Sequence, residues 1–311
     1  MQKKIKTFFS GMILLLLLPF AVTLLFQGEE MFPDITAKES VSGETATEET
    51  KWDSEEIEGR VIAILAKEIS INSEREAIKA QAVIARTNLI GARLAEEDEP
   101  EGLNTNQMMK QFGEESFQRC YEKLAECVNE TKGLVITSGN KIIEAPYFAV
   151  SAGHTRSAAD AFAGEEVSYL KGVESKEDIQ SDEFLRVEFR ELSEFVQTCN
   201  DSYPEAGLTT EDIGSQIEIL SRDEGEYVRE IRLGGTTVNG EEFRKALELH
   251  SACFTIKEVE GKVRIVTKGF GHGVGLSQYG ARVLAGEGKT YEEILKKYFT
   301  DIKITEYKKA E

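Results

Sequence analysis

Three ionisable side chains share one face of a strongly apolar segment, and their types and spacing suit acid–base chemistry. The segment runs from Ser73 to Thr87 and contains Glu76, Lys79 and Arg86. At about 100° per residue, these three side chains fall within a wedge of roughly 80° on an α-helix. A carboxyl group in such a place can deliver and recover a proton. We therefore predict a buried helix that presents Glu76 as a candidate acid–base residue.

The same glutamate also fits a structural role. Ser73-x-x-Glu76 matches a capping box, in which the serine hydroxyl accepts a hydrogen bond from the Glu76 N–H and the carboxylate reaches back to the helix start. Acidic residues in a first helical turn are usually structural, so the spacing alone favours the cap over catalysis. Other parts of the sequence must decide the role of Glu76.

The N-terminus predicts a membrane anchor. Three lysines within residues 1–7 precede an uncharged apolar run at residues 8–26, which is about the length that a helix needs to cross a bilayer. Basic flanks stay in the cytoplasm, so residues 1–7 are expected there and the rest of the chain outside. A cleaved signal peptide is the alternative, but its apolar core would be shorter and no convincing cleavage site follows. Residues 27–52, rich in Glu, Thr, Ser and Gly, are expected to form a flexible acidic tether.

The charge and the cysteine content limit the class of protein. The 311 residues have a formal net charge of −19, which argues against nucleic acid or anionic lipid as the partner of the main domain and favours a neutral polymer. Four cysteines are too few for a disulfide-built scaffold. Only Cys120 and Cys127 are close in sequence. Their spacing leaves three states open: a disulfide, a metal site, or buried free thiols.

The remaining chain predicts an α+β fold. Helical periodicity begins at Asp53 and runs to Ile69, in the helix that we expect to pack beside the central one. Residues 133–150 have the pattern of a β-hairpin about the turn Ser138-Gly139-Asn140. Further elements are expected as a helix at 191–199, a strand at 228–233, a short helix at 240–247, and strands at 252–259 and 263–267.

A glycine-rich stretch follows the last of these strands. Residues 269–281 contain alternate glycines around His272, which permit positive φ and close approach of a ligand to the backbone. The stretch lacks the Lys-Ser/Thr and the acidic residue of nucleotide-binding loops, so nucleotide binding is excluded. The other histidines, His154 and His250, do not stand at helical metal-ligand spacing from it. The pattern therefore favours a hydrogen-bonding histidine over a metal ligand.

Taken together, the segment 76–87 and the stretch 269–281 closely resemble the two motifs of the stage II sporulation protein D family. The resemblance covers roughly residues 54–305, and both motifs are long enough to be specific. It implies a single extracytoplasmic domain at 53–307, anchored in the cell membrane, with a buried helix packed against β-hairpins. It also implies a peptidoglycan lytic transglycosylase that cleaves peptide-stripped glycan strands to 1,6-anhydromuramyl products. Family members do this during septal wall remodelling and engulfment in endospore formation.

The resemblance also assigns residues and partners. It makes Glu76 catalytic. The substrate-binding positions that it suggests are Arg86, Ser151, His272, Ser277, Gln278 and Tyr279. Two departures from the family pattern are Asn88, where an aromatic residue is common, and His154. No metal or cofactor is implied. The expected partners are peptidoglycan glycan strands, a sporulation amidase and membrane proteins of the engulfment machinery.

A lytic transglycosylase needs only one acid–base group, because the 6-hydroxyl of muramic acid attacks within the same molecule. We therefore expect the helix to form the floor of a cleft from which Glu76 reaches the solvent. The alternative is a non-catalytic glycan-binding protein that resembles amidase enhancers. A purely structural septal protein, which would need no groove, is a third possibility.

Overall fold

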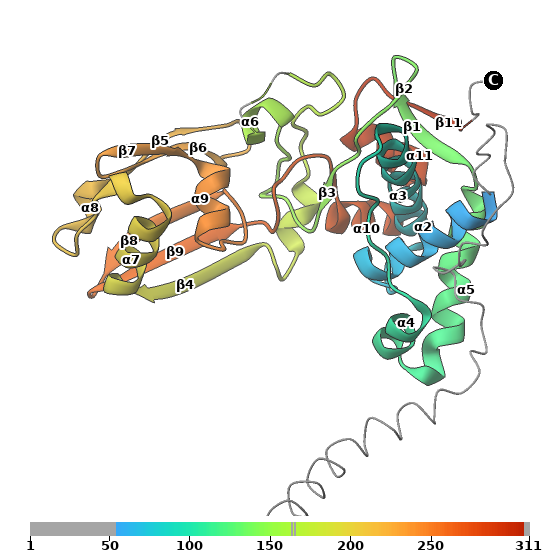
Figure 1. Cartoon of the computed structure of the whole chain (residues 1–311), viewed down its shortest axis with the longest axis horizontal. Coiled ribbons are helices and arrows are strands. Elements are labelled where there is room, and N and C mark those ends of the chain that lie inside the picture. The colour runs from blue at the N-terminus through green and yellow to red at the C-terminus, as the bar shows by residue number, and fades with distance from the viewer. Residues whose placement is uncertain (1–53, 163, 165, 308–311) are drawn as a thin grey trace, which may run out of the picture.

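The computed structural model describes residues 54–162, 164 and 166–307. The cytoplasmic start, anchor and tether predicted for residues 1–52, and Asp53 at the predicted start of the first helix, lie outside the described residues. Among the helices that the structure does describe, none has both the length and the apolar character needed to cross a membrane. Figure 1 shows two lobes, one mainly helical and one mainly of strands.

The helical lobe is made from both ends of the described chain. Its helices are α2 (Ser54–Glu68), α3 (Arg75–Ala95), α4 (Thr105–Phe112), α5 (Glu114–Glu130), α10 (Gln278–Gly286) and α11 (Tyr291–Tyr298). Its antiparallel sheet has the order β11 (Lys303–Glu306), β1 (Leu134–Ser138) and β2 (Lys141–Ile142). Both ends of the described chain therefore contribute to one core.

The central helix α3 is covered on almost every side. One stripe of small and branched residues faces β1, α10 and α11: Ala77, Ala80, Val83 and Ile84. A second stripe faces α2 and α5: Ile78, Ala82, Ala85 and Leu89. Alanine at half of these positions lets the neighbouring elements approach closely. The prediction of a buried helix in this stretch is thus confirmed.

The second lobe contains two three-stranded antiparallel sheets. One has the order β4 (Leu185–Glu191), β9 (Lys262–Lys268) and β8 (Phe254–Val259), and the other has β5 (Ile217–Arg222), β6 (Val228–Leu233) and β7 (Thr236–Asn239). The helices of this lobe are α7 (Leu192–Ser202), α8 (Ile213–Gln216) and α9 (Gly240–Ala246). Buried aromatic residues such as Phe195, Phe243 and Phe254 form its core. Short elements complete the chain: α6 (Ala158–Phe162), η1 (Lys176–Gln180) and η2 (Pro204–Ala206).

The hairpin predicted for residues 133–150 forms only at its turn. β1 pairs with β2 through Ser138 and Lys141, and the chain then leaves the sheet. The reason is that Asn88 on α3 donates to the Ala145 carbonyl and accepts from the Ala145 N–H, at 3.0 and 2.9 Å. Pro146 has no N–H with which to continue a ladder. The next strand, β3 (Tyr147–Phe148), pairs instead in parallel with β10 (Leu276–Ser277), which brings the glycine-rich stretch against it.

The fold class is α+β, as predicted. The four cysteines are buried free thiols. Cys120 and Cys127 lie seven residues apart on α5, or about 10 Å along the helix axis, which is too far for a disulfide. No group of three or more potential metal ligands occurs among the described residues.

Candidate active site

Glu76 lies in the first turn of α3, but it does not cap its own helix. The N-cap residue is Glu74, and its side chain makes no capping hydrogen bond, so the capping box predicted with Ser73 does not form. The Glu76 carboxylate instead accepts a hydrogen bond of 2.8 Å from the backbone N–H of Tyr291, in the first turn of α11. The positive end of that helix dipole favours a negative charge at this point. The side chain of Glu76 keeps 29% of its surface exposed.

A lysine bridges Glu76 to a second carboxylate. The Lys79 ammonium donates to Glu76 over 2.7 Å and is also paired with Glu130 on α5. Arg75 donates to Glu130 and, over 2.7 Å, to Glu126. Burial lowers the pKa of Lys79, but its hydrogen bonds to Glu130 and Glu76 outweigh this and raise it overall. Lys79 is therefore charged, and together with the Tyr291 N–H it holds the two carboxylate oxygens of Glu76 in place.

Arg86 does not belong to this network, which corrects its prediction as a substrate contact. Its side chain has no exposed surface. The guanidinium donates to Glu58 on α2 over 3.0 Å, through Nε, and to the carbonyls of Leu134 and Val128. Glu58 also accepts from the N–H of Gly133. Arg86 thus joins α2, α3, α5 and β1 inside the core, out of reach of a ligand.

Ser151 and Ser277 are also fully buried, so they do not line a groove. Both are tied to Asp178, which accepts from the Ser151 N–H over 3.0 Å and from the Ser277 hydroxyl over 2.7 Å. The Ser277 hydroxyl in turn accepts from the Gly280 N–H and caps α10. Burial raises the pKa of Asp178, while its hydrogen bonds to the two serines act in the opposite direction. These two serines therefore hold the loops together.

The glycines around His272 are required by packing within the chain. Gly271 and Gly275 have positive φ values of 113° and 81°. A Cβ on Gly271 would lie 2.7 Å from the Cβ of Phe148, and one on Gly275 would collide with the carbonyl of Pro146. The groups that come close to these two glycines are thus Pro146 and Phe148 of the chain itself, where the sequence predicted a ligand.

His272 joins the glycine-rich stretch to β3. Its Nδ1 accepts a hydrogen bond of 3.1 Å from the Val274 N–H, so its Nε2 carries the proton and donates to the Tyr147 carbonyl over 3.1 Å. The rings of Phe148 and Phe162 both lie near the imidazole, with ring centroids 5.6 and 6.1 Å from that of His272. Burial lowers the pKa of His272, which keeps it neutral.

The last two predicted substrate contacts are half-buried. Gln278 donates through Nε2 to the carbonyl of Glu68 over 2.8 Å, which ties α10 to the end of α2. The ring of Tyr279 is stacked by the guanidinium of Arg282, whose Cζ lies 5.0 Å from the ring centroid. Of the six predicted contacts, His272, Gln278 and Tyr279 are partly exposed, and the other three are buried.

Sequence reasoning missed the residues that surround Glu76. Glu130 shares Lys79 with it, and Tyr291 supplies the N–H at the helix start. Burial, followed by the charges of Glu292 and Glu76, raises the pKa of Tyr291. The capping box formed by Thr290 could have located the start of α11, but nothing in the sequence indicates that α11 ends up beside α3.

The structural role of Arg86 predicts a loss of stability. In Arg86→Met, Glu58 remains buried without its cation, which costs about 3–5 kcal/mol for a broken buried pair. Urea unfolding measures this loss. Adding Glu58→Leu should recover most of it. As a matched control, Lys289→Met breaks the exposed pair with Glu293 and should cost less than about 1 kcal/mol. Normal stability of Arg86→Met would contradict this assignment.

The half-buried His272, whose pKa is lowered by desolvation, predicts a pH-dependent contribution to stability. Its folded-state pKa lies below the ordinary 6.5, so the unfolded chain binds the proton more readily. Its contribution is therefore complete above pH 6.5 and is lost as the pH falls through the folded-state value. The free energy of unfolding should be measured against pH for the wild type and for His272→Gln, which keeps an acceptor and a donor. The gap between the curves should narrow as the pH falls, and parallel curves would refute this role.

The sequence is similar to one protein-family model and to several known proteins. The family model described as "SpoIID: Stage II sporulation protein" matches residues 45–138. Over 264 residues the chain is 33% identical to Stage II sporulation protein D of Bacillus amyloliquefaciens and 32% identical to that of Bacillus subtilis (strain 168). Each match covers 80% of this chain and 74% of the relative. A shorter match, 44% identical over 57 residues, covers 18% of this chain and 8% of the amidase enhancer of Bacillus subtilis. The chain therefore belongs to the stage II sporulation protein D family.

Proposed function

We propose that this protein is a peptidoglycan lytic transglycosylase in which Glu76 is the general acid and base. The observation that carries the proposal is the placement of Glu76. Its carboxylate is partly exposed, whereas the helix that bears it is buried around it. Two donors, the Lys79 ammonium and the Tyr291 N–H, fix both of its oxygens. A rigidly held, accessible carboxyl group is what proton transfer to a bound substrate requires.

The reaction needs only this one carboxyl group. Hydrolytic glycosidases use two, one to protonate the leaving oxygen and one to activate water or attack the anomeric carbon. In a transglycosylase, Glu76 would protonate the glycosidic oxygen and then accept the proton of the muramic acid 6-hydroxyl as that oxygen bonds to the anomeric carbon. The product is a 1,6-anhydromuramyl end. Because the nucleophile belongs to the same sugar, its effective concentration is high without a second carboxylate.

The pairing of Lys79 leaves Glu76 free to exchange one of its two donors for a substrate. Lys79 and the Tyr291 N–H each hold one oxygen of the Glu76 carboxyl group. Lys79 has a second carboxylate, Glu130, with which it is already paired. It can therefore release Glu76 without losing its counter-charge.

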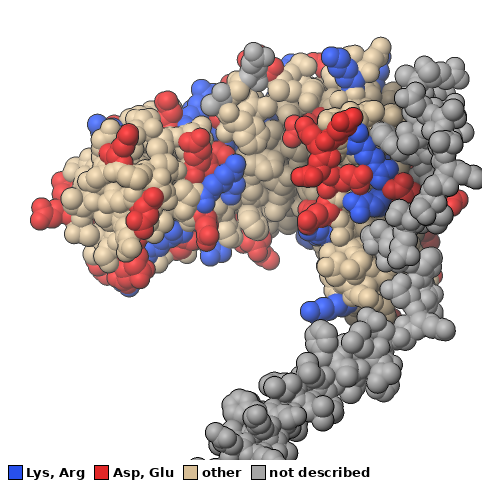
Figure 2. Space-filling model, viewed as in Figure 1, with Lys and Arg blue, Asp and Glu red and all other residues tan. Residues whose placement is uncertain are grey.

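The surface supports a substrate other than nucleic acid. Acidic side chains gather over the helical lobe, with basic ones beside them (Figure 2), and the chain has a net charge of −19. The dense phosphate charge of a nucleic acid would be repelled by this surface. The half-buried Tyr279 and its neighbour Arg282 are the groups that we propose to contact the sugar and its lactyl carboxylate. Peptide-stripped glycan strands, produced by an amidase partner during engulfment, are the substrate that we propose.

Membrane attachment is part of the same proposal. The apolar run at residues 8–26 would anchor the protein with residues 1–7 in the cytoplasm and the described lobes outside. There the protein would meet both the wall and the membrane proteins of the engulfment machinery. The polymer substrate is extracytoplasmic, so this orientation is the one that allows catalysis.

A second candidate function is non-catalytic. The short match to the amidase enhancer favours a glycan-binding protein that presents wall material to an amidase. In that case the surface around Glu76 would bind glycan, and Glu76 would only accept the hydrogen bond from Tyr291 at the start of α11.

Glu76→Gln separates the two functions. The amide preserves the size and one acceptor of the side chain but cannot cycle a proton. Glycan cleavage should fall by about 10²- to 10⁴-fold, while glycan binding is retained. Cleavage of peptide-stripped strands, glycan pull-down and the melting temperature are measured together. Loss of the α11 cap alone would lower stability by about 1 kcal/mol and leave cleavage unchanged.

Glu130→Gln is the matched control for this experiment. It removes a carboxylate from the same lysine but not from the proposed reaction, so the variant should retain most of its cleavage activity. Near-normal turnover of Glu76→Gln would exclude Glu76 as the acid. If wild-type protein also stimulated an amidase without cutting glycan, the enhancer function would replace the proposal.

A further inference from the structure

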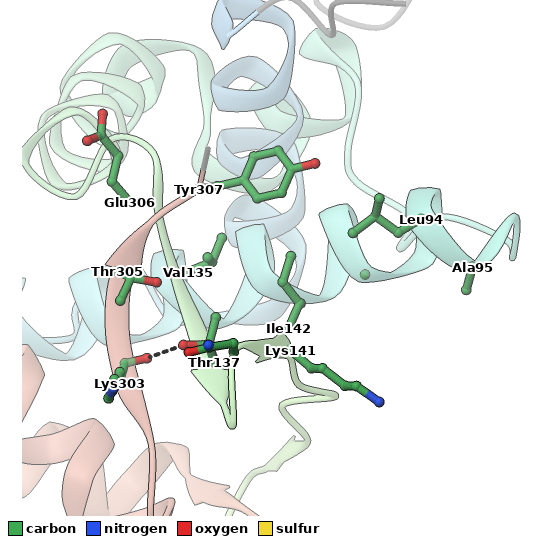
Figure 3. Close-up of a pocket in the computed structure, with 12 residues that line it drawn as sticks. Leu94, Ala95, Val135, Thr137, Lys141, Ile142, Lys303, Thr305, Glu306 and Tyr307 are labelled. Carbon is green, nitrogen blue, oxygen red and sulfur yellow. Dashed lines mark hydrogen bonds between the residues drawn. The ribbon is translucent and has the colours of Figure 1, made fainter. Parts of the chain in front are cut away.

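A large cavity lies at the end of α3 that is remote from Glu76. It measures about 790 Å³ and is enclosed by the last turns of α3 together with β1, β2 and β11. Figure 3 shows the apolar side chains of Leu94, Val135 and Ile142 and the ring of Tyr307 around it. Glu76 and Leu94 stand eighteen residues apart on one helix, so about 27 Å separates them along its axis. The proposed reaction does not use this cavity.

The beginning of α2 lies against the rim of this cavity. Glu56, in the first turn of α2, pairs with Arg93 over 2.6 Å, and Arg93 directly precedes Leu94. Glu58 accepts from the N–H of Gly133, and the Gly133 carbonyl accepts from the N–H of Tyr307 over 2.8 Å. These contacts tie the first turns of α2 to Arg93 and Gly133, each of which is adjacent to or bonded to a residue that lines the cavity.

The residues just before α2 match the cavity in chemistry. Trp52 is the only tryptophan of the chain and stands two residues before Ser54. An extended pair of residues spans about 7 Å, so Trp52 lies within about 7 Å of Ser54 along the chain. An indole ring gains from burial against aliphatic and aromatic groups. Leu94, which is 56% exposed, is such a group.

Charge favours the same occupant. Glu48 and Glu49 precede Trp52 closely in the sequence. Lys141, Lys303 and Glu306, all exposed, contribute to the walls of the cavity, so the charged lining carries one net positive charge. A chain that brings an indole into the cavity therefore brings acidic residues towards two lysines, which adds a favourable though screened interaction.

We propose that Trp52 docks in this cavity and fastens the end of the 27–52 segment to the far end of α3. The membrane-proximal chain then leaves the domain at a fixed point, and α3 itself sets the separation between that point and Glu76. This arrangement would fix how far from the membrane the site can work. The proposal does not depend on the reaction that Glu76 performs.

Fluorescence of the full-length chain in detergent tests the docking, because the signal comes from Trp52 alone. In the native protein the emission should be shifted to shorter wavelength than in the urea-unfolded chain, and the acrylamide quenching constant should be several-fold smaller. Leu94→Asp, at an exposed position, should remove most of this protection. Leu220→Asp, at a 45% exposed position on β5 in the other lobe, is the matched control and should change nothing.

Three results would overturn the proposal. Native emission and quenching equal to those of the unfolded chain would show that Trp52 is not docked. Protection that Leu94→Asp leaves unchanged would place the indole elsewhere. A shift that appears only as the protein concentration rises would show that a second copy fills the cavity. The melting temperature of each variant confirms that the native fold is compared.

Discussion

The need to cover α3 on all sides governs the architecture of the helical lobe. Twelve of its residues, including the charged Arg86, are buried. The local partners α2 and α5 cover only one side, so β1 and the distant α10 and α11 must cover the other. This return of the C-terminal chain places the start of α11 beside Glu76. One packing requirement thus buries the helix and also fixes the orientation of its accessible carboxylate.

Buried charges and hydrogen bonds join the loops between the lobes. Asp178 draws the 151 loop and the start of α10 together through Ser151 and Ser277. Arg156 pairs with Asp223 over 2.7 Å, and both side chains are almost completely buried. Breaking a buried pair of this kind is costly, so the two lobes should keep a defined relation. The glycine-rich stretch packs against β3 and also forms bridges with Arg156 and Ser251.

Local patterns predicted the elements well, but they did not predict how side chains are used. Strong periodicity located α3, and alternation located β6 at residues 228–233. Arg86, Ser151 and Ser277 were expected to contact substrate, yet each is buried and bonded to a partner 27 to 99 residues away. The same holds for Asn88, whose bonds to Ala145 end the predicted hairpin. Such contacts depend on tertiary packing, which hydrophobic periodicity does not encode.

The central claim is that a single carboxyl group, Glu76, cleaves glycan by intramolecular attack. The most direct measurement is the mass of the ends that the wild-type protein releases from peptide-stripped glycan strands. Transglycosylation predicts muramyl ends that are one water lighter than those of hydrolysis, with no incorporation of oxygen from labelled water, because the 6-hydroxyl is the nucleophile. Reducing ends that contain oxygen from labelled water would contradict the account, since they would require a second group to activate water.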